Sequence, residues 1–143
     1  MKEVGFNAEV IKQADNNTNI ALITNCDIPL SVAQYLDVIV PIYNDDVMIT
    51  DEKQWRTRIL YNAYLPFYYS FIIDSHVFPC DKDAPREILK LFAESNVDVS
   101  FSNRTNQRRL VMGGAVLSHW SEGSFEFWKH CYLFMIKNNK VDD

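Results

Sequence analysis

The sequence predicts one α/β domain, residues 1–143, in which a mainly parallel sheet is covered by helices on both faces. A length of 143 residues fits a single domain. The 48% apolar content fits a packed globule and argues against a disordered chain. Helical and strand patterns alternate along the chain, and such alternation is typical of crossover connections between parallel strands.

The first elements follow from short apolar patterns. Residues 3–14 carry apolar side chains at helical spacing, which predicts a helix. Residues 20–23 are apolar on both faces, as in a central parallel strand. Residues 38–42 form a second apolar run, and Pro41 indicates that this strand ends there or lies at a sheet edge, since proline cannot donate to a ladder.

The middle of the chain predicts a helix, a strand and a further helix. Thr50 is a good cap for a helix that ends before Pro66. Residues 68–73 have the highest β-propensity in the chain and predict a strand. Asp83 then caps another helix, because Pro85 falls in its first turn.

The last third predicts two strands and a helix. Residues 97–101 alternate apolar and polar side chains, and residues 110–117 form a second strand. Either Ser121 or Ser124 caps the final helix. In open parallel sheets, ligands bind beyond the carboxyl ends of the strands. We therefore look for chemistry at the residues that follow the strands.

Charge and cysteine content narrow the function class and the compartment. The net charge of −5 disfavours a general nucleic-acid binder, which needs a basic surface. The apolar runs are too short for a membrane segment, and the N-terminus lacks a signal-peptide pattern. Three widely spaced cysteines, Cys26, Cys80 and Cys131, indicate reduced thiols, so we expect a cytoplasmic protein.

Asp74 and His76 are the strongest candidates for metal ligands. They lie two positions apart at the end of a predicted strand, so their side chains share one side. A carboxylate and an imidazole together suit manganese, zinc or iron better than magnesium. The alternative is structural: Asp74 caps the turn and His76 is a hydrogen-bonded surface residue.

Other candidates are basic or glycine-rich. Arg58 lies on the helix before this strand, and an arginine fork suits phosphate oxygens. Gly113 and Gly114 interrupt an apolar strand, which indicates a bulge or a close backbone approach. A Cys80–His76 nucleophilic pair is a third, unrelated possibility.

Four segments, in this order and spacing, resemble the nucleotide-diphospho-sugar transferases of the GT-A type. They cover most of the chain and comprise residues 19–25, residues 37–42, residues 55–76 and residues 111–117. The third segment resembles the helix, the Pro/aromatic turn and the strand that carries the family's DxD signature. The resemblance implies a Rossmann-like, GT-A-like sheet and transfer of a sugar from a nucleotide-diphosphate donor to an unknown acceptor.

The resemblance also implies roles for individual residues. Asp74 and His76 take the places of the two DxD aspartates, which in the family hold a divalent ion, usually Mn²⁺, against the diphosphate. The positions implied to contact the donor are Thr24, Asn25, Arg58, Asp74, Ser75, Gly113 and Gly114. Metal and arginine would there neutralise the charge of the leaving nucleoside diphosphate.

This sequence departs from the family pattern in several respects, two of which bear on the metal site and the sheet. The motif reads DxH, and the chain opens directly at a helix, so we expect the sheet to lack the family's usual first strand and the chain to be a fragment or a degenerate relative. A missing strand predicts an exposed sheet edge and a possible homodimer. The alternative function is therefore a non-catalytic binding or assembly module on the same scaffold.

Overall fold

The computed structural model describes residues 1–42, 59–75, 77, 81–102 and 112–138. The labelled elements are α1 (Lys2–Ala14), β1 (Ala21–Thr24), α2 (Leu30–Ala33), β2 (Val38–Pro41), β3 (Tyr69–Ile73), α4 (Ala84–Glu94), β4 (Val99–Ser102), β5 (Met112–His119) and α5 (Glu122–Asn138). Residues 59–62 are also helical. The structure therefore confirms an α/β chain. No helix within the described ranges has the length and apolar character needed to cross a membrane.

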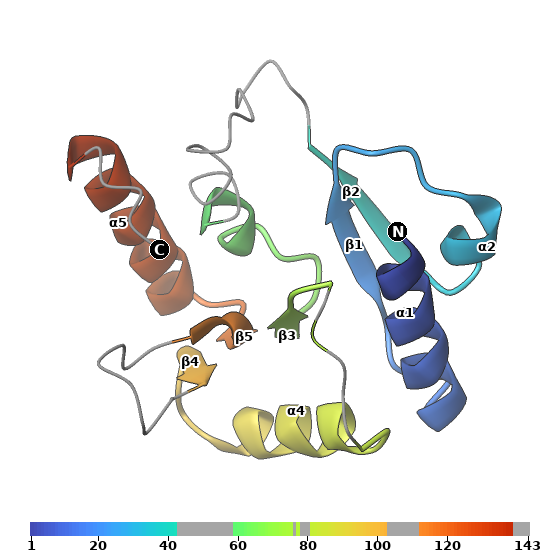
Figure 1. Cartoon of the computed structure of the whole chain (residues 1–143). Coiled ribbons are helices and arrows are strands. Elements are labelled where there is room, and N and C mark those ends of the chain that lie inside the picture. The colour runs from blue at the N-terminus through green and yellow to red at the C-terminus, as the bar shows by residue number, and fades with distance from the viewer. Residues whose placement is uncertain (43–58, 76, 78–80, 103–111, 139–143) are drawn as a thin grey trace.

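The strands form two separate sheets (Figure 1). β1 and β2 pair in parallel, and β3, β5 and β4 form an antiparallel sheet with β5 in the centre. The prediction of a mainly parallel sheet is therefore wrong for the second half of the chain. Only residues 103–111 separate β4 from β5, and a parallel crossover needs a dozen or more residues. β3 and β4, which are joined through α4, do run in the same direction.

A carboxylate joins α1 to the parallel pair. Asp37 Oδ2 lies 2.8 Å from Lys12 Nζ of α1 and accepts a 2.7 Å hydrogen bond from the Ile20 N–H just before β1. The hydrogen bond from Lys12, followed by that from Ile20, holds the pKa of Asp37 below its ordinary value. β2 is an edge strand of the described sheet and ends at Pro41, as predicted.

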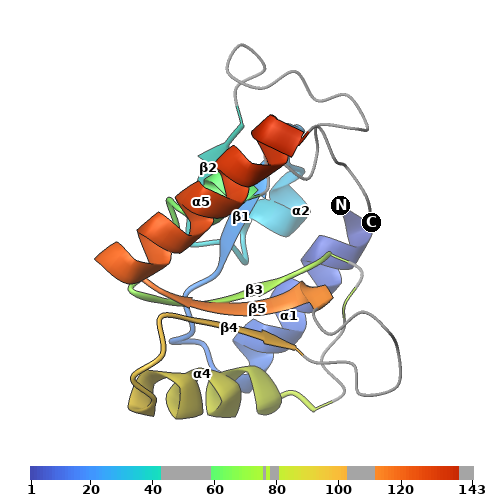
Figure 2. The ribbon, with the colours of Figure 1, turned by 90° about the vertical axis from the view of Figure 1, so that its left-hand side faces the viewer.

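Helices cover both faces of the antiparallel sheet. Figures 1 and 2 show α5 on one face and α4 on the other. On the face that α5 covers, Trp128 of this helix is 4% exposed and packs in a cluster with Val116 and Ala63. Under α4, the ring of buried Phe92 lies edge-on to Tyr69, with 6.2 Å between centroids. Coverage of both faces is therefore confirmed for this sheet.

The helix starts follow the predicted caps. α5 begins after Ser121, whose Oγ accepts a 3.1 Å bond from the Ser124 N–H, while Ser124 Oγ accepts a 3.3 Å bond from the Ser121 N–H. Asp83 occupies the cap position of α4 and Pro85 lies in its first turn, as predicted, but the Asp83 side chain makes no capping hydrogen bond. β4 begins at Val99, two residues later than predicted. Val97, the predicted first residue, precedes the strand and is 47% exposed.

Candidate functional site

A cavity of about 750 Å³ lies between the two sheets. β1 and β3 line it, together with α1, part of α4 and residues between 61 and 67. Three of the predicted donor-binding residues line this cavity: Asn25 after β1, and Asp74 and Ser75 after β3. The structure therefore brings the ends of two strands, far apart in the sequence, to one hollow.

Asp74 directly follows β3 and is half-buried. Its N–H donates to the Gly114 carbonyl of β5 at 3.1 Å, and its own carbonyl accepts from the Val77 N–H at 2.9 Å. The first bond continues the β3–β5 ladder by one residue, and the second closes a tight turn around Ser75. The backbone of Asp74 is thus fixed on both sides.

The glycine pair in β5 produces both of the features that the sequence suggested. The β4–β5 register jumps from Phe101↔Val116 to Ser102↔Met112, so β5 carries extra residues there, among them Gly113 and Gly114. A Cβ on Gly114 would lie 3.2 Å from Asp74 Oδ2. Gly114 therefore leaves room for the Asp74 carboxylate against the sheet.

Thr24 and Asn25 play different parts at the end of β1. Thr24 Oγ1 accepts a 3.1 Å hydrogen bond from the Cys26 N–H, so its hydroxyl serves the local turn. Asn25 is exposed and lines the cavity, and its Oδ1 accepts a 3.5 Å hydrogen bond from Cys26 Sγ. Of these two, Asn25 is better placed to meet a ligand.

Asn7 of α1 is a positioning residue that the sequence analysis missed. It is 5% exposed, and its Nδ2 donates to the Ser75 carbonyl at 3.1 Å and to the Val77 carbonyl at 3.0 Å. These two bonds tie α1 to the turn after β3. The sequence feature that could have revealed its role is the position of this polar residue within the apolar stripe that also contains Val4 and Ile11, because a buried amide needs hydrogen-bond partners.

Several predicted residues lie outside the described part of the chain. They are Arg58, His76 and Cys80. Among the described residues, no cluster of three or more His, Cys, Asp or Glu side chains is present. Asp74 is therefore the one predicted metal ligand that the structure places, as a carboxylate at the edge of a cavity.

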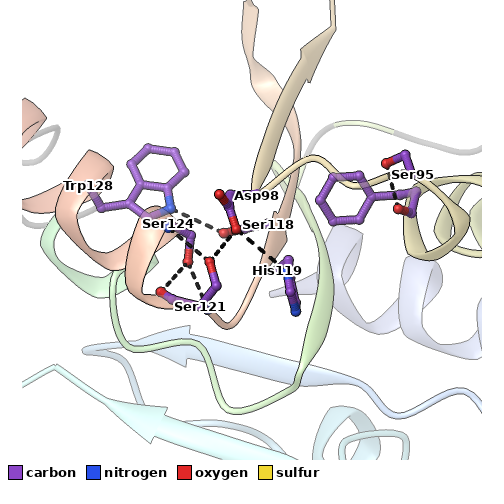
Figure 3. Close-up of polar contacts among 8 residues, drawn as sticks. Ser95, Asp98, Ser118, His119, Ser121, Ser124 and Trp128 are labelled. Carbon is purple, nitrogen blue, oxygen red and sulfur yellow. Dashed lines mark hydrogen bonds and ion pairs between the residues drawn. The ribbon is translucent and has the colours of Figure 1, made fainter.

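A second polar cluster joins β4, β5 and α5 (Figure 3). Asp98 Oδ1 accepts a hydrogen bond from Ser121 Oγ and lies 3.7 Å from His119 Nδ1. The aspartate thus lies between serine and histidine, whereas nucleophilic catalysis needs the histidine next to the hydroxyl. Ser118 is buried and accepts a 3.2 Å bond from Trp128 Nε1. This arrangement fixes the start of α5 and does not form a catalytic triad.

Comparisons of the chain with protein-family models, with curated proteins and with solved structures find no match.

Proposed function

We propose that this chain is a nucleotide-diphosphate-sugar-binding domain of the glycosyltransferase type. The observation that supports it best is the position of Asp74. Its carboxylate follows the apolar strand β3 at the edge of the antiparallel sheet, packs against Gly114 and borders a cavity that Asn25 and Ser75 also line. The resemblance to GT-A-type transferases requires a carboxylate at a strand end beside a cavity. The proposal also assigns the Rossmann-like sheet of that family to this chain.

The donor set suits a divalent ion that carries a diphosphate. Asp74 supplies one hard oxygen ligand, and His76 is proposed as the second. Two protein ligands leave positions that diphosphate oxygens and water can fill. Mn²⁺ bound there would neutralise the negative charge that builds up on the leaving nucleoside diphosphate.

The remaining residues bind and orient the donor in this proposal. Asn25 follows β1 of the other sheet and offers an amide to the nucleotide at the same cavity. Arg58 supplies positive charge to the phosphates. Gly113 lets the donor sugar approach the backbone of β5, and Gly114 makes room for the Asp74 carboxylate. Asn7 keeps the turn with Ser75 in place through its two hydrogen bonds. Thr24 contributes through the turn that presents Asn25.

Titration calorimetry with UDP and GDP, with and without MnCl₂, tests this function. The native chain should bind at least one of them about tenfold or more tightly with Mn²⁺, a difference of about 1.4 kcal/mol. Asp74→Asn should lose this enhancement. Glu94→Gln, which makes the same charge change at the end of α4, should keep it. Equal affinity with and without Mn²⁺, or an unchanged enhancement in Asp74→Asn, would overturn the proposal.

The second candidate is a non-catalytic binding or assembly module on the same scaffold. The two separate sheets favour it, because a domain with open strand edges offers surfaces for other chains. A turnover assay separates the candidates. A transferase releases nucleoside diphosphate from UDP-sugars or GDP-sugars in the presence of an acceptor, whereas an assembly module releases none.

A further inference from the structure

The side chain of Asn25 is oriented by the residue that follows it. Cys26 Sγ donates to Asn25 Oδ1 at 3.5 Å, and a thiol hydrogen is a donor that an amide oxygen can accept. The Cys26 N–H donates to Thr24 Oγ1 at 3.1 Å, which closes a tight turn around Asn25 and fixes the backbone that carries the thiol. The turn after β1 therefore favours one of the two orientations of the Asn25 amide.

The two ends of an asparagine amide have opposite hydrogen-bonding chemistry. The oxygen only accepts, whereas the nitrogen only donates. Because Oδ1 faces the thiol, Nδ2 lies on the side of the amide that is turned away from Cys26. A half-turn of the amide would exchange the S–H···O bond for a bond to sulfur, which is a weak acceptor. The thiol thus makes Asn25 a donor toward a ligand.

The surroundings of Asn25 in the cavity suit the ring of a nucleobase. The Ile42 N–H donates to the Thr24 carbonyl at 2.8 Å, so Ile42 lies beside the end of β1. Ile23 and Ile42 line the cavity together with Asn25. Ligand sites commonly combine apolar walls with a few polar groups that set the orientation of the ligand. A base has matching features, since its faces pack on apolar side chains and its edge carries donors and acceptors.

We propose that Cys26 sets the base specificity of the nucleotide site by holding Asn25 as a hydrogen-bond donor. The cavity then favours bases with a keto oxygen at the edge that Asn25 meets, uracil and guanine, over the amino bases cytosine and adenine. An amino group that faces Nδ2 would oppose two donors and leave both unsatisfied. This inference rests on the proposed function, in which Asn25 contacts the nucleotide. Cys26 is a positioning residue, because it acts through Asn25.

Calorimetry with UDP and CDP in the presence of MnCl₂ tests the inference, because their bases differ only at the edge that carries the keto or amino group. The native chain should bind UDP about tenfold more tightly than CDP. Cys26→Ala lets the amide turn, so this ratio should fall below about threefold. Cys26→Ser keeps a hydroxyl donor and should keep the ratio. Cys131→Ala, which removes a thiol from α5, should keep it as well.

Asn25→Asp places the opposite chemistry at the same position. A carboxylate only accepts hydrogen bonds, so this variant should bind CDP more tightly than UDP. The added negative charge weakens the binding of both nucleotides alike, because they carry the same diphosphate. The ratio of the two affinities therefore reports recognition of the base separately from any loss of nucleotide affinity.

Three outcomes would overturn the inference and leave the proposed function standing. They are equal affinity of the native chain for UDP and CDP, a native ratio in Cys26→Ala, and a retained preference for UDP in Asn25→Asp. Weaker binding of both nucleotides by Cys26→Ala at an unchanged ratio belongs to the second outcome, since Cys26 would then only stabilise the turn. No binding of any nucleoside diphosphate would overturn the proposed function, and this inference with it.

Discussion

Replacing Asn7 by alanine should loosen the turn that presents Ser75 to the cavity. The Asn7 side chain is 5% exposed and donates two hydrogen bonds, to the carbonyls of Ser75 and Val77 at 3.1 and 3.0 Å. Alanine removes both donors and leaves two backbone carbonyls at the inner side of α1 without these partners. The variant should therefore be less stable than the native chain, and the loss should concentrate at the turn.

The size of this effect can be worked out from the two contacts. Each intramolecular hydrogen bond contributes about 1 kcal/mol net, and leaving a part-buried carbonyl without its partner adds to the loss. Alanine recovers roughly 0.5 kcal/mol because it is a better helix former than asparagine. We expect a net loss of about 1.5–2.5 kcal/mol in the free energy of unfolding. For a chain of this length, that corresponds to a decrease of roughly 3–10 °C in melting temperature.

Urea denaturation measures the loss, and amide exchange at residues 74–77 locates it. Gln13→Ala is the matched control, because Gln13 is an exposed amide on the same helix that bonds to Glu9 one turn away. The control should change stability by less than about 0.5 kcal/mol. If Asn7→Ala behaves like Gln13→Ala, with no faster exchange at the turn, then Asn7 does not position this site.

Three further predictions concern the packing and the charges around the sheets. Trp128→Phe removes the indole N–H from a buried serine hydroxyl and should cost about 2–3 kcal/mol of unfolding free energy in urea titrations. Gly123→Ala should destabilise the chain by about 1–2 kcal/mol in the same assay, although alanine is normally the better helix former. The reason is that the new Cβ would collide with the Asp98 carboxylate. Asp37→Asn should lower stability at neutral pH. Lys12 holds the pKa of Asp37 down in the folded chain, so the difference from the native chain should shrink as the pH falls below 3.8, the ordinary pKa of an aspartate, as followed by urea titrations across pH.

Local elements were predictable because local patterns encode them. The run before Asp74 combines high β-propensity with an abrupt change to polar residues, and it forms β3 with Asp74 directly after it. The glycine pair at 113–114 indicated a bulge or a close approach, and both occur. Ser121 and Pro85 marked the helix starts because each satisfies a requirement of the first helical turn.

Strand direction and long-range partners were not predictable in the same way. The direction of β5 depends on its pairing with β3 and β4, and the apolar run at 110–117 would look the same in either direction. The short connection between β4 and β5 was the sequence feature that could have indicated an antiparallel pair. The role of Asn7 depends on carbonyls 68 and 70 positions away along the chain, so its polarity within an apolar stripe could raise the question but not supply the partner.

A crystal structure of the chain soaked with UDP and MnCl₂, with anomalous scattering from manganese, tests the central claim most directly. The account predicts a manganese peak within about 2.0–2.6 Å of an Asp74 carboxylate oxygen, with the diphosphate on the same ion and the nucleoside near Asn25. A nucleotide bound elsewhere, or no manganese peak at Asp74 at saturating concentrations, would contradict it.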